Sequence, residues 1–68
     1  MKEILRSNDM VLVSYVQSLL DESSISYIVL DNHMSVVEGS LGILPRRLMV
    51  DDEEFLHAQK ILKDAGIQ

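Results

Sequence analysis

The sequence predicts a single α+β domain, residues 1–68, with the element order strand-helix-strand-strand-helix. Two segments, 10–22 and 51–65, repeat apolar residues at the spacing of a helix with one buried face. Three shorter segments alternate in polarity or are rich in β-branched and aromatic residues, as strands are: 2–6, 25–30 and 46–50.

The composition limits both the core and the partners of this domain. A chain of 68 residues buries only about 60% of the surface that its unfolded form exposes, so the core must be small. Six Lys plus Arg against eleven Asp plus Glu give a net charge of −5, which repels nucleic-acid phosphates and anionic lipids. Cysteine is absent, which excludes disulfides and thiolate metal sites. The first residues are charged, and no apolar run approaches the roughly 20 residues of a membrane span. We therefore expect a cytoplasmic protein that binds neither nucleic acid nor membrane.

Alternation along the strands predicts which side chains share a face. In the first strand, Ile4 and Arg6 are expected on one face, with Glu3 and Leu5 on the other. The third strand alternates in the same way, with one set of residues on each face: Arg46, Leu48 and Val50 against Arg47 and Met49.

The first helix, residues 10–22, follows residues typical of a helix start. A side-chain oxygen of Ser7 or Asn8 can accept from the free amides of the first turn, and Asp9 favours the positive end of the helix dipole. Ser23-Ser24 end this helix without the glycine usually preferred there, which costs some cap stability.

The last helix follows a cluster of acidic residues. Asp51 and Glu54 have the spacing of an Asp-x-x-Glu variant of the capping box. Gly66 is placed to end the helix in the left-handed conformation. Its buried stripe is predicted to be Phe55, Ala58, Ile61, Leu62 and Ala65.

The simplest packing of these elements is a ferredoxin-like fragment. Its three-stranded antiparallel sheet has the order 1-3-2, and both helices cover one face. A right-handed helical crossover joins the first two strands, which are parallel. The first strand has an open edge, which must be blunted, covered or paired with another chain. The small core, this edge and the apolar loop described next predict a homo-oligomer, with a dimer favoured.

The segment 31–45 is long for so small a domain, and loops of this length tend to be functional or mobile. It is also unusually apolar, so it either closes the sheet face opposite the helices or forms an interface. A short strand around residues 35–38 is a further possibility.

Asp31, His33, Glu38 and His57 are the candidates for a metal site or an acid-base pair. Asp31 and His33 have a spacing that strands and turns can use, but no third ligand follows at motif spacing. A surface pair with Glu53 accounts for His57. We expect no metal and no cofactor.

Gly39-Ser40-Leu41-Gly42 matches a bare GxxG pattern. Nucleic-acid binders place that pattern between helices in basic surroundings, and phosphate loops add a lysine. Both contexts are missing, so flexible turns are the better interpretation. No serine or threonine lies in a nucleophile-elbow pattern, and we expect no enzymatic activity.

Arg46 and Arg47 carry the strongest polar signal, because alternation sends their side chains to opposite faces of the sheet. Guanidinium groups bind carboxylates and phosphates bidentately. One interpretation is a solvated edge or an internal ion pair with Glu38 or Asp31, and the other is binding of an anion or a partner. The candidate binding residues are Arg46, Arg47, His33, Glu38 and Gly39.

The chain resembles a small bacterial family described as signal-transducing proteins of unknown function. The resemblance covers nearly the whole chain and is carried by Leu19-Leu20, Ile25, Asp31, His33-Met34-Ser35-Val36, Glu38-Gly39-Ser40, Pro45-Arg46-Arg47-Leu48-Met49-Val50, Ala58 and Ile61-Leu62. Many members have glycine in place of Ser24. The resemblance implies a ferredoxin-like domain grouped near the PII (GlnB) regulators, and it implies no catalytic residue or cofactor.

Two functions are weighed on these grounds. The first is a non-enzymatic regulatory or interaction module that binds a protein partner through the central loop and Arg46-Arg47. The second is a PII-like sensor that binds a small anionic metabolite or nucleotide near the same arginines.

Overall fold

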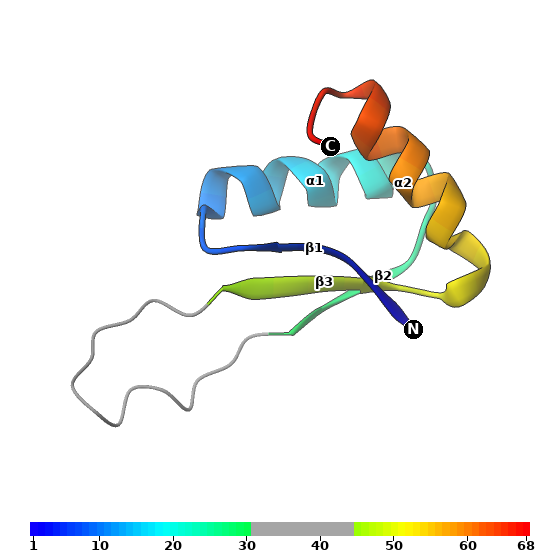
Figure 1. The fold of residues 1–68 in the computed structure, drawn as a ribbon, viewed down its shortest axis with the longest axis horizontal. Coiled ribbons are helices and arrows are strands. Elements are labelled where there is room, and N and C mark those ends of the chain that lie inside the picture. The colour runs from blue at the N-terminus through cyan, green and yellow to red at the C-terminus, as the bar shows by residue number, and fades with distance from the viewer. Residues whose placement is uncertain (31–44) are drawn as a thin grey trace.

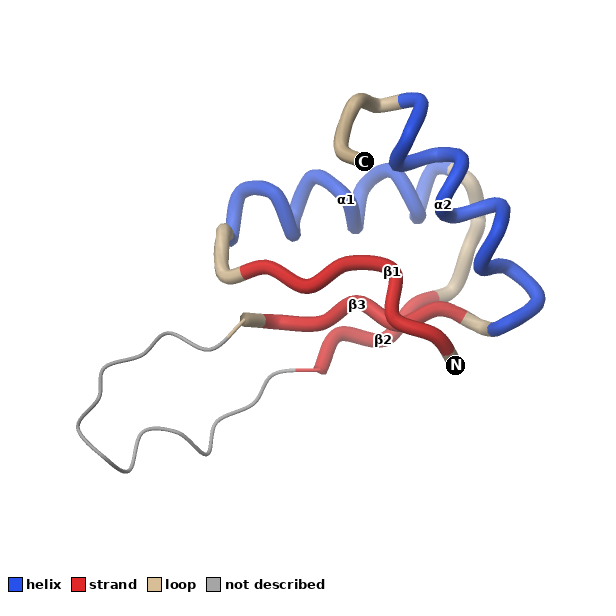
Figure 2. The backbone as a smooth tube through the Cα atoms, in the orientation of Figure 1, coloured by secondary structure: helices blue, strands red, loops and turns tan. Residues whose placement is uncertain are grey.

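The structure, a computed structural model, describes residues 1–30 and 45–68. Its elements follow the predicted order: β1 (Lys2–Ser7), α1 (Met10–Glu22), β2 (Tyr27–Leu30), β3 (Arg46–Val50), the 3₁₀ turn η2 (Asp52–Glu54) and α2 (Phe55–Asp64). The sheet has the order β1-β3-β2, and both strand pairs are antiparallel. Figures 1 and 2 show both helices on the same side of the sheet. The predicted α+β fold class is therefore confirmed. The predictions for residues 31–44, including the short strand, lie outside the described residues.

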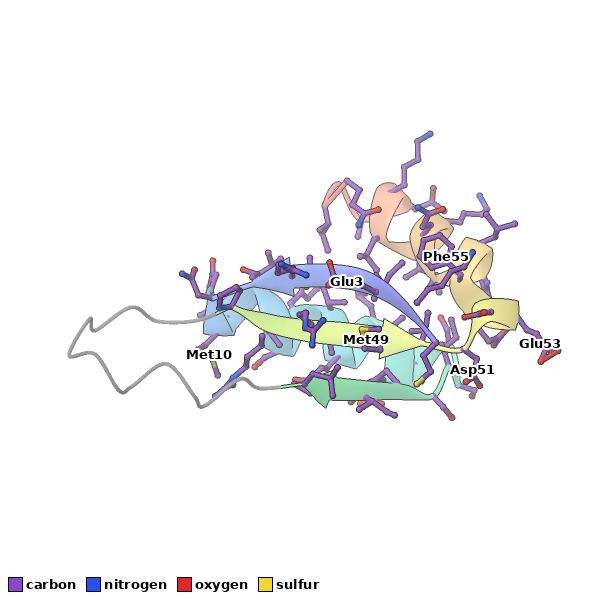
Figure 3. The ribbon with its side chains drawn as sticks, turned by 60° about the horizontal axis from the view of Figure 1, so that its bottom comes forward. Glu3, Met10, Met49, Asp51, Glu53 and Phe55 are labelled. Atoms are coloured by element: carbon purple, nitrogen blue, oxygen red, sulfur yellow. The ribbon has the colours of Figure 1, made fainter. Side chains whose placement is uncertain are left out.

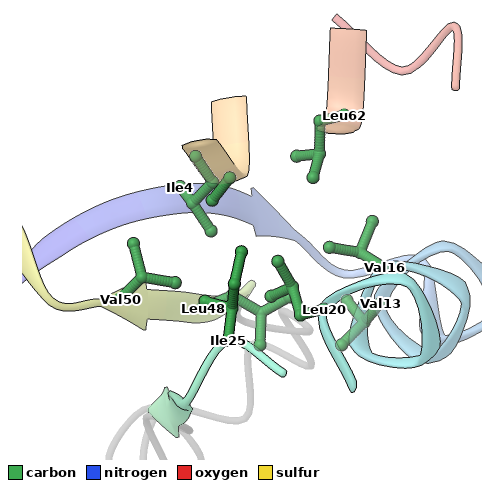
Figure 4. Close-up of a cluster of buried hydrophobic side chains, with 9 residues drawn as sticks. Ile4, Val13, Val16, Leu20, Ile25, Leu48, Val50 and Leu62 are labelled. Carbon is green, nitrogen blue, oxygen red and sulfur yellow. The ribbon is translucent and has the colours of Figure 1, made fainter. Parts of the chain in front are cut away.

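The core lies between the sheet and the two helices (Figure 4). Its central members come from β3, where Leu48 and Val50 are fully buried. Every element except η2 contributes at least one buried or partly buried apolar side chain to this cluster. The buried residues are all apolar: Ile4, Val13, Val16, Leu20, Ile25, Leu48, Val50, Ala58 and Leu62.

A β-bulge at Ile4 changes the face pattern of β1. Glu3 pairs with Met49 and Leu5 pairs with Leu48, so Ile4 is an extra residue in the ladder. Ile4 is buried, and Leu5 also packs against the core. Simple alternation predicted that these two residues face opposite sides, which is wrong because the bulge shifts the phase of the strand by one residue.

The free edge of β1 is partly occupied by the C-terminal segment. The Gln68 side-chain Nε2 donates to the Ile4 carbonyl oxygen at 3.0 Å. A bulge and an occupied carbonyl both make an edge a poorer template for a further strand. The predicted open edge is thus blunted at Ile4.

α1 has the predicted bounds but a different capping residue, and α2 begins later than predicted. Asp9, not Ser7 or Asn8, is the N-cap of α1: its Oδ1 accepts from the amides of Val11 at 3.0 Å and Leu12 at 3.2 Å. The Ser7 hydroxyl oxygen accepts from the Asp9 amide instead. Before α2, the chain forms the 3₁₀ turn η2, in which the Glu54 amide donates to the carbonyl oxygen of Asp51.

The predicted capping box at α2 is therefore wrong. Asp51 precedes η2 and makes no side-chain cap bond, and α2 itself begins only at Phe55. The acidic side chains of η2 still lie at the N-terminal end of the helix, where its dipole favours negative charge.

The two helices end in the same way. After α2, the amide of Gly66 donates to Lys63 and that of Ile67 donates to Leu62, which is a Schellman motif. After α1, the amides of Ser24 and Ile25 make the equivalent bonds to Asp21 and Leu20. The motif needs a left-handed residue, and Gly66 has a φ of 80° whereas Ser24 has a φ of 57°. Ser24 thus holds a backbone conformation that favours glycine.

We predict that Ser24→Gly raises the free energy of unfolding by about 0.5–1 kcal/mol. Glycine removes the strain of an L-residue in the left-handed conformation, and the greater conformational entropy that glycine loses on folding offsets part of this gain. Urea denaturation measures the change.

Ser23→Gly is the matched control. Ser23 has a φ of −95°, outside the left-handed region, so glycine there only loosens the unfolded chain and should give no gain. Equal effects of the two substitutions would contradict the explanation.

Candidate functional site

The sheet face turned away from both helices is the candidate site, and we call it the open face. Figure 3 shows the sheet from this side, with Glu3 and Met49 labelled on it and α1 behind the strands. Because Leu48 and Val50 point into the core, Arg47 and Met49, which alternate with them along β3, point to the other side, together with the residues paired with them in the ladder. The open face consists of Glu3, Arg6, Ile28, Leu30, Arg47 and Met49.

Strand register orders the open face into two rows. Met49 is paired with Glu3 of β1 and with Ile28 of β2. Arg47, further along the central strand, is paired with Arg6 and with Leu30. Each row therefore runs from a charged residue on β1 to an aliphatic residue on β2.

The β2 side of the open face is apolar and accessible. Ile28 is 48% exposed and Leu30 is 37% exposed. Met49, on the central strand beside them, is half-buried. Neighbouring exposed aliphatic side chains on one sheet face are typical of a surface that another structure covers.

The β1 side brings two arginines together. Arg6 lies directly opposite Arg47, and like charges in cross-strand positions repel. Glu3 offsets the charge of Arg6, accepting at Oε1 from Nη2 at 2.9 Å and from Nε at 3.3 Å. The bulge at Ile4 makes this pair possible, because it brings Glu3 and Arg6 onto the same face. Within residues 1–30 and 45–68, no ion pair offsets the charge of Arg47.

A family model described as "Putative prokaryotic signal transducing protein" matches residues 1–66 of the chain. The chain belongs to this family. The match includes every helix and strand of the fold, and it ends before Gln68, whose side chain bonds to β1. A search of curated proteins finds no match. The family description refers to signal transduction and names no ligand, partner or reaction.

The structure places the predicted arginines on opposite faces, as alternation required. Arg47 lies on the open face, whereas Arg46 is paired with Ser7 at the start of β3, on the side of Leu48 and Val50. Both arginines are half-buried. Of the other predicted binding residues, His33, Glu38 and Gly39 lie outside the described residues.

Arg6 is the member of the site that sequence reasoning missed. Alternation assigned it to the face of Ile4, because a bulge has no signal in a strand as short as β1. The sequence held one hint, the opposite charges of Glu3 and Arg6 three residues apart. Residues three apart on a regular strand face opposite sides, so an ion pair between them requires a bulge.

The remaining metal and acid-base candidate that the structure describes is His57, which is exposed on α2. Its predicted pair with Glu53 is wrong, because no bond between them forms among the described residues. In the same part of the chain, no three acidic or histidine side chains gather as metal ligands. No helix within residues 1–30 and 45–68 is long and apolar enough to cross a membrane.

Charge is distributed unevenly along the strands. Every arginine of the sequence, Arg6, Arg46 and Arg47, lies where β1 ends and β3 begins, and we call this the arginine end. The opposite end of the sheet carries exposed carboxylates, and Figure 3 shows Asp51 and Glu53 beyond the arrowhead of β3. We call it the acidic end, and its members are Asp21, Glu22, Asp51, Asp52 and Glu53.

Cations offset this acidic end only in part. The N-terminal amine of Met1 lies 3.1 Å from Asp52. The Lys2 ammonium lies 5.0 Å from the centre of the Phe55 ring, a cation–π distance. The exposed carboxylates at the end of α1 and after β3 therefore keep this end negative.

A second surface feature is a shallow groove along α2. It is lined by Leu56, Gln59, Lys60, Lys63, Asp64 and Gln68. Lys60 and Asp64 pair across it at 3.4 Å, between two well-exposed side chains. Such a pair contributes little in water, and the groove has none of the enclosure of a small-molecule site. The open face is therefore the stronger candidate.

Tyr27 is a titratable group near the acidic end. Its hydroxyl donates to Asp21 Oδ2 at 3.4 Å. Burial, and then the charge and hydrogen bond of Asp21, raise the pKa of Tyr27 above its ordinary value of 10.0. The bond ties the start of β2 to the end of α1, which is a structural role.

We predict that Tyr27→Phe flattens the alkaline loss of stability. A raised pKa in the folded state means that the contribution of Tyr27 is complete below its unfolded pKa and is lost as the pH rises through the folded pKa. Urea denaturation between about pH 8 and pH 11 should show a shallower decline for the variant. Tyr15→Phe, at an exposed position on α1, is the control and should keep the wild-type slope; identical slopes for both variants would contradict the assignment.

Proposed function

We propose that the chain is a non-catalytic interaction module of a signalling pathway, which binds a protein partner through the open face. The observation that carries the proposal is the sheet face that both helices leave uncovered within residues 1–30 and 45–68, where exposed Ile28 and Leu30 adjoin Met49 and Arg47. The family description, which names signal transduction, supports the same class of function.

The composition of the open face suits protein binding. Protein interfaces are enriched in arginine and methionine and surround an apolar centre with polar side chains. Arg47 lies beside the aliphatic residues and directly opposite another cation, so a carboxylate from outside the described chain would relieve that repulsion. Burial of both arginines beneath a partner would make such contacts stronger than at an exposed site.

The chemistry of the open face also supports a non-catalytic role. Its only carboxylate, Glu3, is already held by two bonds from Arg6. Aliphatic side chains make up much of the remainder, and they bind rather than react. The net charge of −5 supports a partner that is neither nucleic acid nor an anionic membrane, and the proposal assigns the module to the cytoplasm.

We predict that a photoreactive amino acid at Ile28 captures a protein partner in living cells, whereas the same group at Val11 does not. Val11 is 79% exposed on α1, so it controls for accessibility on the helix side of the molecule. Adding Arg47→Ala should lower the yield at Ile28 by about tenfold, as expected for a central interface arginine worth about 1.4 kcal/mol. Mass spectrometry of the adducts is the measurement.

Equal capture at Ile28 and Val11 would overturn the proposal. The competing function, a sensor of a small anionic metabolite or nucleotide, has its own readout in a thermal-shift screen. A ligand that binds the folded state raises the melting temperature, and a rise that Arg47→Ala abolishes, without any protein adduct at Ile28, would favour that function instead.

A further inference from the structure

We infer that the partner of the open face is a second copy of this chain, stacked face to face with its strands antiparallel to those of the first. The inference rests on the proposed function, because it names the occupant of the same surface. Three features of the described residues carry it: the apolar half of the open face, the polarity of charge along the strands, and the blunted edge of β1.

The apolar half can cover itself in such a pair. Ile28 and Leu30 both project from β2 onto the open face, at 48% and 37% exposure. Two sheets that stack face to face lie about 10 Å apart, with their side chains between them. Placing β2 over β2 of the other copy removes both aliphatic pairs from water at once.

Charge decides the direction of stacking. With parallel strands, the arginine end of one copy would lie on the arginine end of the other, which brings Arg47 of the central strand over its own counterpart. With antiparallel strands, the arginine end lies beside the acidic end, where Asp51, Asp52 and Glu53 are exposed. Complementary potentials of this kind select the orientation of a complex.

The antiparallel arrangement also has a self-consistent register. The two-fold axis of such a pair lies between the two sheets and perpendicular to the strands. It places the row that contains Met49 in one copy over the row that contains Arg47 in the other. Arg6 of each copy then lies over Glu3 of the other, and Leu30 of each copy lies over Ile28 of the other. The carboxylate that offsets Arg6 within one chain is thus joined by a second one from the other chain.

The β1 edge of the sheet is a poor site for strand addition, which favours stacking over pairing through this edge. The Ile4 bulge interrupts β1, and the Gln68 amide occupies the Ile4 carbonyl oxygen. Edge-to-edge pairing would need these carbonyl and amide groups free along the strand. Face-to-face stacking uses side chains of the open face, so within the described residues it does not depend on free backbone groups of β1.

Cysteine cross-linking tests the geometry directly, because the chain has no cysteine of its own. Ile28→Cys and Leu30→Cys are made as separate proteins, and one of them is labelled with ¹⁵N because the two variants have equal mass. A short bismaleimide is added to each protein alone and to the mixture. We expect mixed dimers to exceed the self-linked dimers of either variant. Predominant self-linking would indicate parallel strands and overturn the inference.

Charge exchange tests the register, with sedimentation equilibrium as the readout. Wild type should dimerise with rising concentration, and Arg6→Glu should weaken the dimer by about tenfold, since it brings like charges together at both symmetry-related positions. The double variant Glu3→Arg with Arg6→Glu restores the opposite-charge pairs and should restore the dimer. Thermal unfolding of each variant confirms that the monomer fold persists.

The two proposals fail separately. A chain that stays monomeric at every concentration overturns this inference. If Ile28 then captures a different protein in cells, the proposed function stands with another partner. If Ile28 captures nothing more than Val11, both fall.

Discussion

The burial of β3 between two antiparallel neighbours and beneath two helices is the constraint on which the rest of the structure depends. Leu48 is fully buried at its centre, paired with Leu5 on one side and Val29 on the other. Because side chains alternate along a strand, this burial forces Arg47 and Met49 onto the opposite side of the sheet. The composition of the open face on β3 is therefore a direct consequence of which β3 side chains the core buries.

The bulge at Ile4 links the core to the open face. The extra residue lets Ile4 and Leu5 both contribute to the core, which matters in a chain too short to bury much surface. The same shift carries Arg6 to the open face, opposite Arg47 and within 2.9 Å of Glu3. A feature that improves packing on one side thus creates the charge pattern on the other. Its position next to the Gln68 bond also blunts the β1 edge.

A domain of this size has little room for an enclosed site, and the description of its family names no chemistry. Its described surface instead has one uncovered sheet face and a separation of charge along the strands. An interaction module uses such features, since apolar contact supplies affinity and charge selects orientation. Dimerisation would also enlarge a small core by covering Ile28 and Leu30, so stability and recognition would depend on the same residues.

The sequence by itself determined the elements, their order, the sheet topology and the faces of β3, because periodicity and turn chemistry act within short windows of the chain. It also indicated the cap strain at Ser24 and placed Arg46 and Arg47 on opposite faces. Tertiary structure alone decided the bulge, the meeting of Arg6 with Arg47 and the bond from Gln68 to Ile4. The physical reason is that strand register and edge contacts join residues far apart in the chain. Their free energy belongs to the packed sheet and helices together, and no local pattern records it.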